Sequence, residues 1–120
     1  SDDDNVLKIG KRMKVFVLKT CDTCRKAIRE MTAAGHAIDV TDVRADGVSK
    51  QDLTRFYNAF GDDLVNKRST TWRGLSDAER ARDSIDLLVD HPTLMKRPVI
   101  EADGQLFLGW TDQVRAALLG

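Results

Sequence analysis

This chain of 120 residues has no formal net charge and few cysteines and histidines. Lysine and arginine number 19, and so do aspartate and glutamate, so the formal net charge is zero. This balance argues against a protein built to neutralise nucleic-acid phosphates, and we expect no direct nucleic-acid binding. No apolar run is long enough to cross a bilayer, so we expect no contact with a membrane. The acidic start S-D-D-D-N is unlike the basic start of a signal peptide, and we expect a cytoplasmic protein with reduced thiols.

The cysteines and histidines are too few for an ordinary zinc site. Such a site needs four ligands, usually two cysteine pairs or one pair with histidines. Here Cys21 and Cys24 form the single pair, and His36 and His91 lack ligand-like spacing. We therefore expect no metal. A structural disulfide across two residues would gain little chain entropy, so the pair is either two ordinary buried thiols or a redox centre.

The hydrophobic pattern predicts an α/β protein of the order β-α-β-α-[helical insertion]-β-β-α, with a mixed sheet. Residues 1–12 are expected to be a tail that is disordered at its start. Residues 13–120 are expected to form one domain, with the insertion at about 62–96. We expect strands at 13–19, 37–43, 98–101 and 105–108.

Several local signals support these boundaries. Ser49 with Asp52 and Ser76 with Glu79 have the spacing of capping boxes, and Thr111 is placed to cap the last helix. The dipeptide Asp103-Gly104 favours a tight hairpin turn. These signals predict three helix starts and one hairpin.

Cys21 lies at a junction between the first strand and the first helix, where free backbone N–H groups favour an anion. A thiolate is an anion and is the reactive form of cysteine. The helix terminus and a nearby cation, such as Arg25 or Lys26, are expected to raise the thiolate fraction. Cys24 follows one turn later on the same helix face and is placed to resolve a mixed disulfide at Cys21. A C-x-x-C sequence near a β-α-β pattern is typical of thioredoxin-like redox sites.

Pro98 opens the third strand and has two interpretations. A proline cannot donate to a sheet ladder, so it belongs at the start or the edge of a strand. Alternatively, it is a cis-proline that faces the thiol and leaves a peptide edge free for substrate. The residue types alone leave both interpretations open, because cis bonds are a minority, ~5% of X–Pro bonds.

Four segments occur in a specific order along the chain. They are C-D-T-C-R-K-A from Cys21, D-V-R-A-D-G from Asp42, N-K-R-S-T-T-W-R-G-L from Asn66 and K-R-P-V-I from Lys96. Together they resemble the ArsC/Spx family of arsenate reductase-like proteins, and in particular its YffB-like branch. The resemblance extends from about Met13 to the C-terminus.

The resemblance implies a thioredoxin-like fold with a helical insertion, a catalytic cysteine at Cys21 and a following arginine at Arg25. It also implies that Arg97 faces an oxyanion or a glutathionyl group and that Pro98 is cis. Arg68 or Arg73 would supply a middle arginine, and we include Thr20, directly before the cysteine, among the binding residues. A planar guanidinium suits a carboxylate or an oxyanion.

Two departures from the family pattern bear on the activity. Arsenate reductases of the family usually have a small polar residue at the position of Cys24, and a further arginine where this chain has Trp110. We therefore expect a glutathione-dependent thiol–disulfide oxidoreductase with Cys21, Cys24 and Arg25 at the catalytic centre. The alternatives are an arsenate reductase and an Spx-like redox sensor that binds RNA polymerase.

The expected partners follow from this chemistry. Glutathione would be a co-substrate rather than a bound cofactor. The substrate would be a glutathionylated or disulfide-bonded molecule, and glutaredoxin is a possible redox partner. We expect a monomer.

Overall fold

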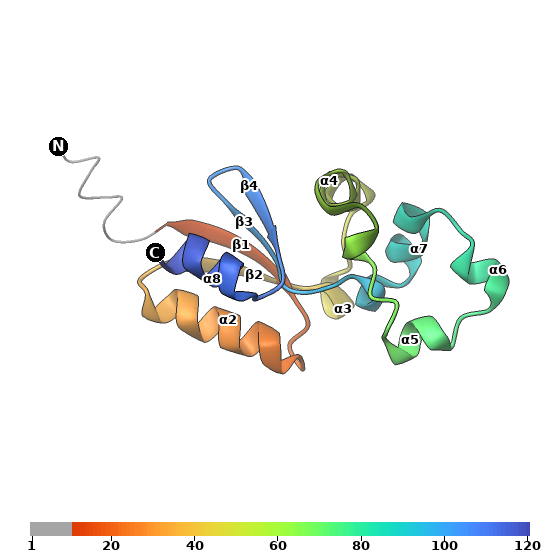
Figure 1. Cartoon of the computed structure of the whole chain (residues 1–120), viewed down its shortest axis with the longest axis horizontal. Coiled ribbons are helices and arrows are strands. Elements are labelled where there is room, and N and C mark those ends of the chain that lie inside the picture. Colours follow the sequence, from red (N-terminus) through yellow and green to blue (C-terminus); the bar gives the residue numbers. More distant parts are fainter. Residues whose placement is uncertain (1–10) are drawn as a thin grey trace. The chain divides into compact units, whose positions relative to one another are not determined.

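The computed structural model describes residues 11–120, which divide into two compact units (Figure 1). One unit runs up to Thr41 and resumes at Arg97, and the other is Asp42–Lys96. The insertion expected at about 62–96 lies inside the second unit, which begins earlier, at Asp42. Of the expected tail over 1–12, residues 1–10 lie outside the described residues, and Arg12 begins the first strand.

The first unit holds a four-stranded sheet of order β2-β1-β3-β4. β1 and β3 pair antiparallel, with Val15 opposite Ile100, and β3 and β4 also pair antiparallel. Helix α2 connects β1 to its other neighbour, β2, as a crossover between parallel strands does. This confirms the predicted α/β fold with a mixed sheet. The elements are β1 (Arg12–Val17), α2 (Asp22–Ala33), β2 (Ala37–Asp42), β3 (Val99–Ala102), β4 (Gln105–Leu108) and α8 (Asp112–Leu119).

The core of the first unit lies between one face of the sheet and the helices α2 and α8. Alternate residues of β1 point to this face, as the period of a strand requires. The residues of α2 that meet them recur at helical spacing, and α8 adds Leu118. The buried residues of the cluster are Met13, Val15, Val17, Cys24, Ala27, Met31, Ile100, Ala102 and Leu118.

Turns and caps in the first unit follow the sequence closely. Asp103 and Gly104 have φ angles of 52° and 74° between β3 and β4, which is the turn that Asp-Gly favours. The hydroxyl of Thr111 accepts a hydrogen bond of 3.2 Å from the N–H of Val114 and caps α8. Both local predictions are confirmed.

The second unit is helical, apart from an isolated antiparallel bridge between Val65 and Met95. Within it, α4 packs against α7, and η2 packs against α3 and α5. Its elements are α3 (Val43–Asp46), α4 (Lys50–Phe60), η1 (Gly61–Leu64), α5 (Thr70–Arg73), α6 (Asp77–Arg80), α7 (Ser84–Asp90) and η2 (Pro92–Leu94).

Side-chain caps start most helices of this unit. Ser49 accepts from the N–H of Asp52 at 3.0 Å, and Ser76 accepts from the N–H of Glu79 at 3.1 Å, so both predicted serine caps are present. Buried Asp42 caps α3 in the same way. Within residues 11–120, no helix has the length and apolar character needed to cross a membrane.

Candidate active site

Cys21 is the N-cap residue of α2, as the strand–helix junction predicted. Its backbone is extended, its N–H donates to the carbonyl of Leu18 at 2.9 Å, and its carbonyl accepts the first helical hydrogen bond, from Arg25, at 3.0 Å. The residue is half-buried. The sulfur therefore lies beside the N–H groups of the first helical turn, where an anion is favoured.

The environment lowers the pKa of Cys21 below the ordinary value of a cysteine. Burial acts in the opposite direction and raises it. The backbone N–H and the thiol of Cys24, the positive charge of Arg97 and the N–H of Thr23 together outweigh burial. Hydrogen bonds and a cation both favour the thiolate, so of the two thiols Cys21 is the one whose ionisation is favoured.

Cys24 has the opposite environment, although it lies only one helical turn away. It is 1% exposed and belongs to the core cluster. Burial, with smaller contributions from the hydrogen bond to Cys21 and the charge of Cys21, raises the pKa of its thiol to about 12. Both cysteines are free thiols in the structure. Cys24 therefore keeps its proton at neutral pH, and its thiol is hydrogen-bonded to Cys21.

Arg97 and Pro98 directly precede β3, and the peptide bond between them is cis, as the family resemblance implied. Pro98 is buried, and its carbonyl accepts a hydrogen bond of 2.8 Å from Gly109. The charge of Arg97 acts on both cysteines, lowering the pKa of each. The structure thus brings Cys21, Cys24 and Arg97 together within the first unit.

Arg25 and Thr20 flank the thiol on the protein surface. The guanidinium of Arg25 donates from Nε to the carbonyl of Lys19 at 2.8 Å, and its Nη1 lies 3.7 Å from Asp22. Thr20 is exposed in the turn before Cys21. Arg97, and not Arg25 or Lys26, is the cation among the main causes of the lowered pKa of Cys21.

Arg68 and Arg73 belong to the second unit. The Nη2 atom of Arg73 donates to the carbonyl of Arg68 at 3.0 Å, which occupies part of its guanidinium. The side chain of Arg68 lines an open cavity of about 440 Å³ with Lys67 and Lys96. Arg73, the other candidate for the middle arginine, is not among the residues that line this cavity.

A network around Glu30 was not predicted from the sequence. The carboxylate of Glu30, on α2, accepts hydrogen bonds from Nε1 of Trp110 at 2.8 Å and from Nε and Nη2 of Arg115 at 2.8 and 3.1 Å. The bonds from Arg115 and then from Trp110 lower the pKa of Glu30. Trp110 was expected to replace a family arginine, and its polar atom is directed to Glu30. The partners are 80 and 85 residues apart, so no local pattern reveals the network.

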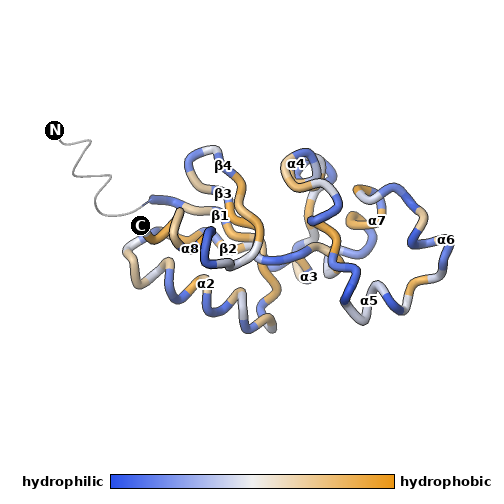
Figure 2. The backbone as a smooth tube through the Cα atoms, in the orientation of Figure 1, coloured by the Kyte–Doolittle hydropathy of each residue, from blue (hydrophilic) through white to orange (hydrophobic). Residues whose placement is uncertain are grey.

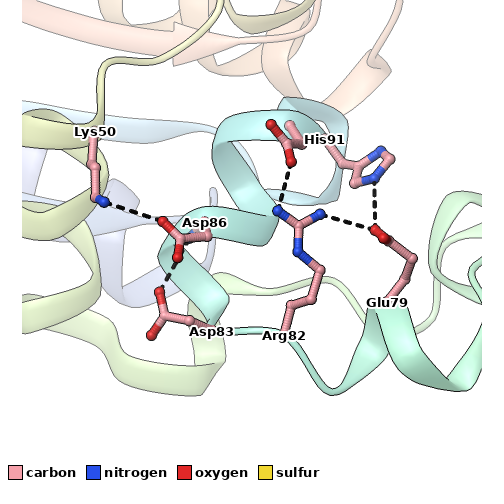
Figure 3. Close-up of polar contacts among 7 residues, drawn as sticks. Lys50, Glu79, Arg82, Asp83, Asp86 and His91 are labelled. Carbon is pink, nitrogen blue, oxygen red and sulfur yellow. Dashed lines mark hydrogen bonds and ion pairs between the residues drawn. The ribbon is translucent and has the colours of Figure 1, made fainter.

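Both histidines are engaged in structural contacts. His36 accepts from the N–H of Lys11 at Nδ1 and donates from Nε2 to the carbonyl of Leu118, each at 3.0 Å. His91 lies 3.5 Å from Glu79, which also pairs with Arg82 (Figure 3). Within residues 11–120, no three side chains of His, Cys, Asp or Glu gather as metal ligands would.

The fold and this cysteine pair define a thioredoxin-like protein with a thiol at the N-terminus of its first helix. The chain belongs to the ArsC family, whose model matches residues 16–117. The resemblance carried by the four sequence segments is thereby confirmed.

Relatives of known sequence or structure extend over most of the chain. An uncharacterized protein of Haemophilus influenzae is 41% identical over 108 residues, which are 82% of this chain and 91% of that protein. The structure of the YFFB protein is 30% identical with a TM-score of 0.83, and the match covers 90% of this chain and 99% of that one. An arsenate reductase-related protein from Brucella melitensis is 28% identical with a TM-score of 0.65, over 88% of this chain and 92% of its own.

Proposed function

We propose that the chain is a glutathione-dependent thiol–disulfide oxidoreductase in which Cys21 is the nucleophile. The observation that carries this proposal is the contrast between the two thiols. Cys21 is half-buried with a lowered pKa, and Cys24, one turn on, is buried with a pKa of about 12. A pair with one activated and one protonated thiol is suited to attack on a disulfide followed by resolution.

In the first step, the thiolate of Cys21 attacks one sulfur of a substrate disulfide. A bond forms between that sulfur and the sulfur of Cys21, and the substrate's S–S bond breaks. The other substrate sulfur leaves as a thiolate and takes a proton from solvent. The attacked half of the substrate is then held on Cys21 as a mixed disulfide.

The second step releases the bound half of the substrate by one of two routes. The thiol of Cys24 can lose its proton and attack the sulfur of Cys21, which gives a Cys21–Cys24 disulfide and a free substrate thiol. Two glutathione molecules then reduce that disulfide and become oxidised glutathione. Alternatively, where the bound half is a glutathionyl group, a second glutathione attacks it directly, giving oxidised glutathione and the Cys21 thiolate.

Glutathione would be held by residues around the thiol. Arg97 is the best placed cation for a glutathione carboxylate, because its charge already acts on Cys21. Thr20 directly precedes the thiol in the chain, Arg25 follows it by one helical turn, and Pro98 directly follows Arg97. This chemistry needs a reducing thiol pool, so we propose that the protein acts in the cytoplasm. We further propose that it is a monomer and that glutaredoxin is a possible redox partner.

The test is reduction of a glutathionylated peptide with glutathione as the reductant, followed by mass spectrometry of the protein. We expect Cys21→Ser to abolish turnover and the glutathione adduct. Cys24→Ser should retain turnover if a second glutathione resolves the intermediate, and should trap the mixed disulfide if Cys24 does. Full turnover by Cys21→Ser would refute the proposal.

A further inference from the structure

The exposed face of α2 beside the thiol is rich in positive charge. Cys24, Ala27 and Met31 face the core, whereas Arg25, Lys26 and Arg29 are exposed. Residues at these intervals share one helix face, so the three cations form a patch, which we call the basic face of α2. The patch begins one turn after Cys21, and Arg29 lies eight residues along the helix from Cys21, a rise of about 12 Å. Figure 2 shows hydrophilic residues recurring along this helix.

The acidic residues of α2 do little to offset the basic face. The helix has two, Asp22 and Glu30. Glu30 is directed to Trp110 and Arg115, and its charge is matched mainly by Arg115 and, more weakly, by Lys26. The side chain of Asp22 is fully exposed and lies 3.7 Å from Arg25. Within residues 11–120, neither Lys26 nor Arg29 has a carboxylate at ion-pair distance.

The position of these cations does not stabilise the helix. Cations favour the C-terminal end of a helix, because the last carbonyls carry partial negative charge. In α2 the last turn has no basic residue, and Arg25 and Lys26 lie in the first two turns. Helix stability therefore does not explain their placement, whereas attraction of an anionic partner to the N-terminal end, where the thiol lies, does.

We propose that the basic face of α2 selects an acidic polypeptide as the disulfide substrate of Cys21. This inference rests on the proposed function and specifies the class of substrate. The polypeptide carries a cysteine in disulfide linkage, with aspartate and glutamate residues beside it. Their carboxylates lie along Arg25, Lys26 and Arg29 while the thiolate of Cys21 attacks the substrate's disulfide, as in the first step above. Complementary charge of this kind acts mainly on the rate of association.

The experiment compares three glutathionylated peptides that differ only in the residues flanking the cysteine: aspartate and glutamate, serine and glycine, or lysine. The second-order rate constant for reaction with Cys21 is measured at low and at high salt. At low salt we expect the acidic peptide to react about ten times faster than the lysine peptide. At about 0.5 M salt this preference should largely disappear, because the surface charges are screened.

The variant that tests the face is the double substitution Lys26→Gln and Arg29→Gln, which leaves the residues proposed to react or bind glutathione in place. We expect it to lower the preference for the acidic peptide several-fold and to leave the rate of the serine-glycine peptide unchanged. The matched control is the double substitution Arg12→Gln and Lys14→Gln. These two exposed residues alternate with the core-facing residues of β1, so their side chains leave the sheet on the face away from α2. The control should keep the preference.

The outcomes separate this inference from the proposed function. If none of the three peptides reacts, the proposed function fails. If all three react at equal rates at low salt, or if the control variant loses the preference as much as the test variant, the acidic-substrate inference is overturned and the proposed function stands. Stronger competition by an oligonucleotide than by polyglutamate would assign the basic face to a nucleic acid and would also overturn it.

Discussion

At the scale of single residues, two thiols one helical turn apart have opposite environments. Cys21 is at the N-cap, where unpaired N–H groups and Arg97 favour the thiolate. Cys24 is buried in the hydrophobic core, where a negative charge on its sulfur is unfavourable and the thiol keeps its proton. The lowered pKa of Cys21 and the raised pKa of Cys24 both follow from where each thiol lies along one helix. The C-x-x-C spacing itself therefore creates the difference in pKa.

The pH dependence of alkylation tests this asymmetry. We expect Cys21 to react with iodoacetamide at a pH below that of an ordinary cysteine, because its pKa is lowered, while Cys24 stays unreactive until far more alkaline pH. Arg97→Gln removes a cation that favours the thiolate, so the pKa of Cys21 rises. The alkylation profile then moves to higher pH, and the rate below its midpoint falls several-fold. Mass spectrometry after timed alkylation assigns the rate to each cysteine.

Arg12→Gln is the control for that experiment, because it removes an exposed arginine from the same unit. Its alkylation profile should match that of the wild type. Equal shifts in the two variants would mean that net charge, and not the proximity of Arg97, sets the pKa of Cys21.

The sequence predicted part of this site and missed another part, for a physical reason. The position of Cys21 follows from a local pattern, an apolar run followed by helical spacing, and the structure shows it at the N-cap. The same local view suggested Arg25 or Lys26 as the cation that acts on the thiol. The structure shows Arg97, which is 76 residues away in sequence, because β3 lies next to β1 in the sheet. Only the family resemblance pointed to Arg97.

At the scale of elements, α2 is fixed at its N-terminal end by the sheet and along its second half by α8. Glu30 on α2 accepts from Arg115 on α8 and from Trp110, and the neighbour of Trp110, Gly109, bonds to the carbonyl of Pro98. This chain of contacts connects the helix that carries the thiol to the segment that carries Arg97.

We expect Trp110→Phe to lower the Tm by a few degrees, because it keeps the ring and removes the N–H that Glu30 accepts. A double-mutant cycle with Glu30→Ala isolates the pair. In the Glu30→Ala background, Trp110→Phe should cost less than it does in the wild type. Equal costs in both backgrounds would show that the hydrogen bond does not contribute to stability. Thermal unfolding followed by circular dichroism gives the four Tm values.

The packing of α2 on the sheet is tested by Met31→Ala. Met31 is 0% exposed in the core cluster, so truncation leaves a cavity and should lower the free energy of unfolding by about 2–5 kcal/mol. The control is Val40→Ala on the edge strand β2, where the side chain is 42% exposed and the cost should stay below about 1 kcal/mol. Urea unfolding measures both. A cost for Met31→Ala as small as that of the control would contradict the packing described for α2.

Elements were predicted best where a local chemical signal marks their ends. Ser49, Ser76, Thr111 and the Asp103-Gly104 turn all have the predicted roles, because a cap or a tight turn is decided within four residues. The helix α3 was not predicted, because its four residues are too few to show a helical period. Gly47 does end that helix, with a φ angle of 70°.

At the scale of the whole molecule, the element order was predictable and the grouping of its segments was not. The first unit joins two segments that are far apart in the chain, since β3 pairs with β1 across more than eighty residues. Hydrophobic periods locate strands, but they do not say which strands become neighbours. The four segments that carry the family resemblance fall in both units, with Cys21 and Arg97 in the first and Arg68 and Arg73 in the second.

The distribution of cations leads to a prediction about arsenate. Arsenate carries more than one negative charge, and its binding beside a thiol needs several cations. The charge of Arg97 lowers the pKa of Cys21. Trp110 stands where the family's arsenate reductases have an arginine, but it is neutral and donates its N–H to Glu30. We therefore expect reduction of a glutathionylated peptide without arsenate-dependent turnover. Both are measured as glutathione consumption in the presence of glutaredoxin, with Cys21→Ser as the blank. Arsenate turnover that Cys21→Ser abolishes would instead make this chain an arsenate reductase that works without an arginine at the position of Trp110.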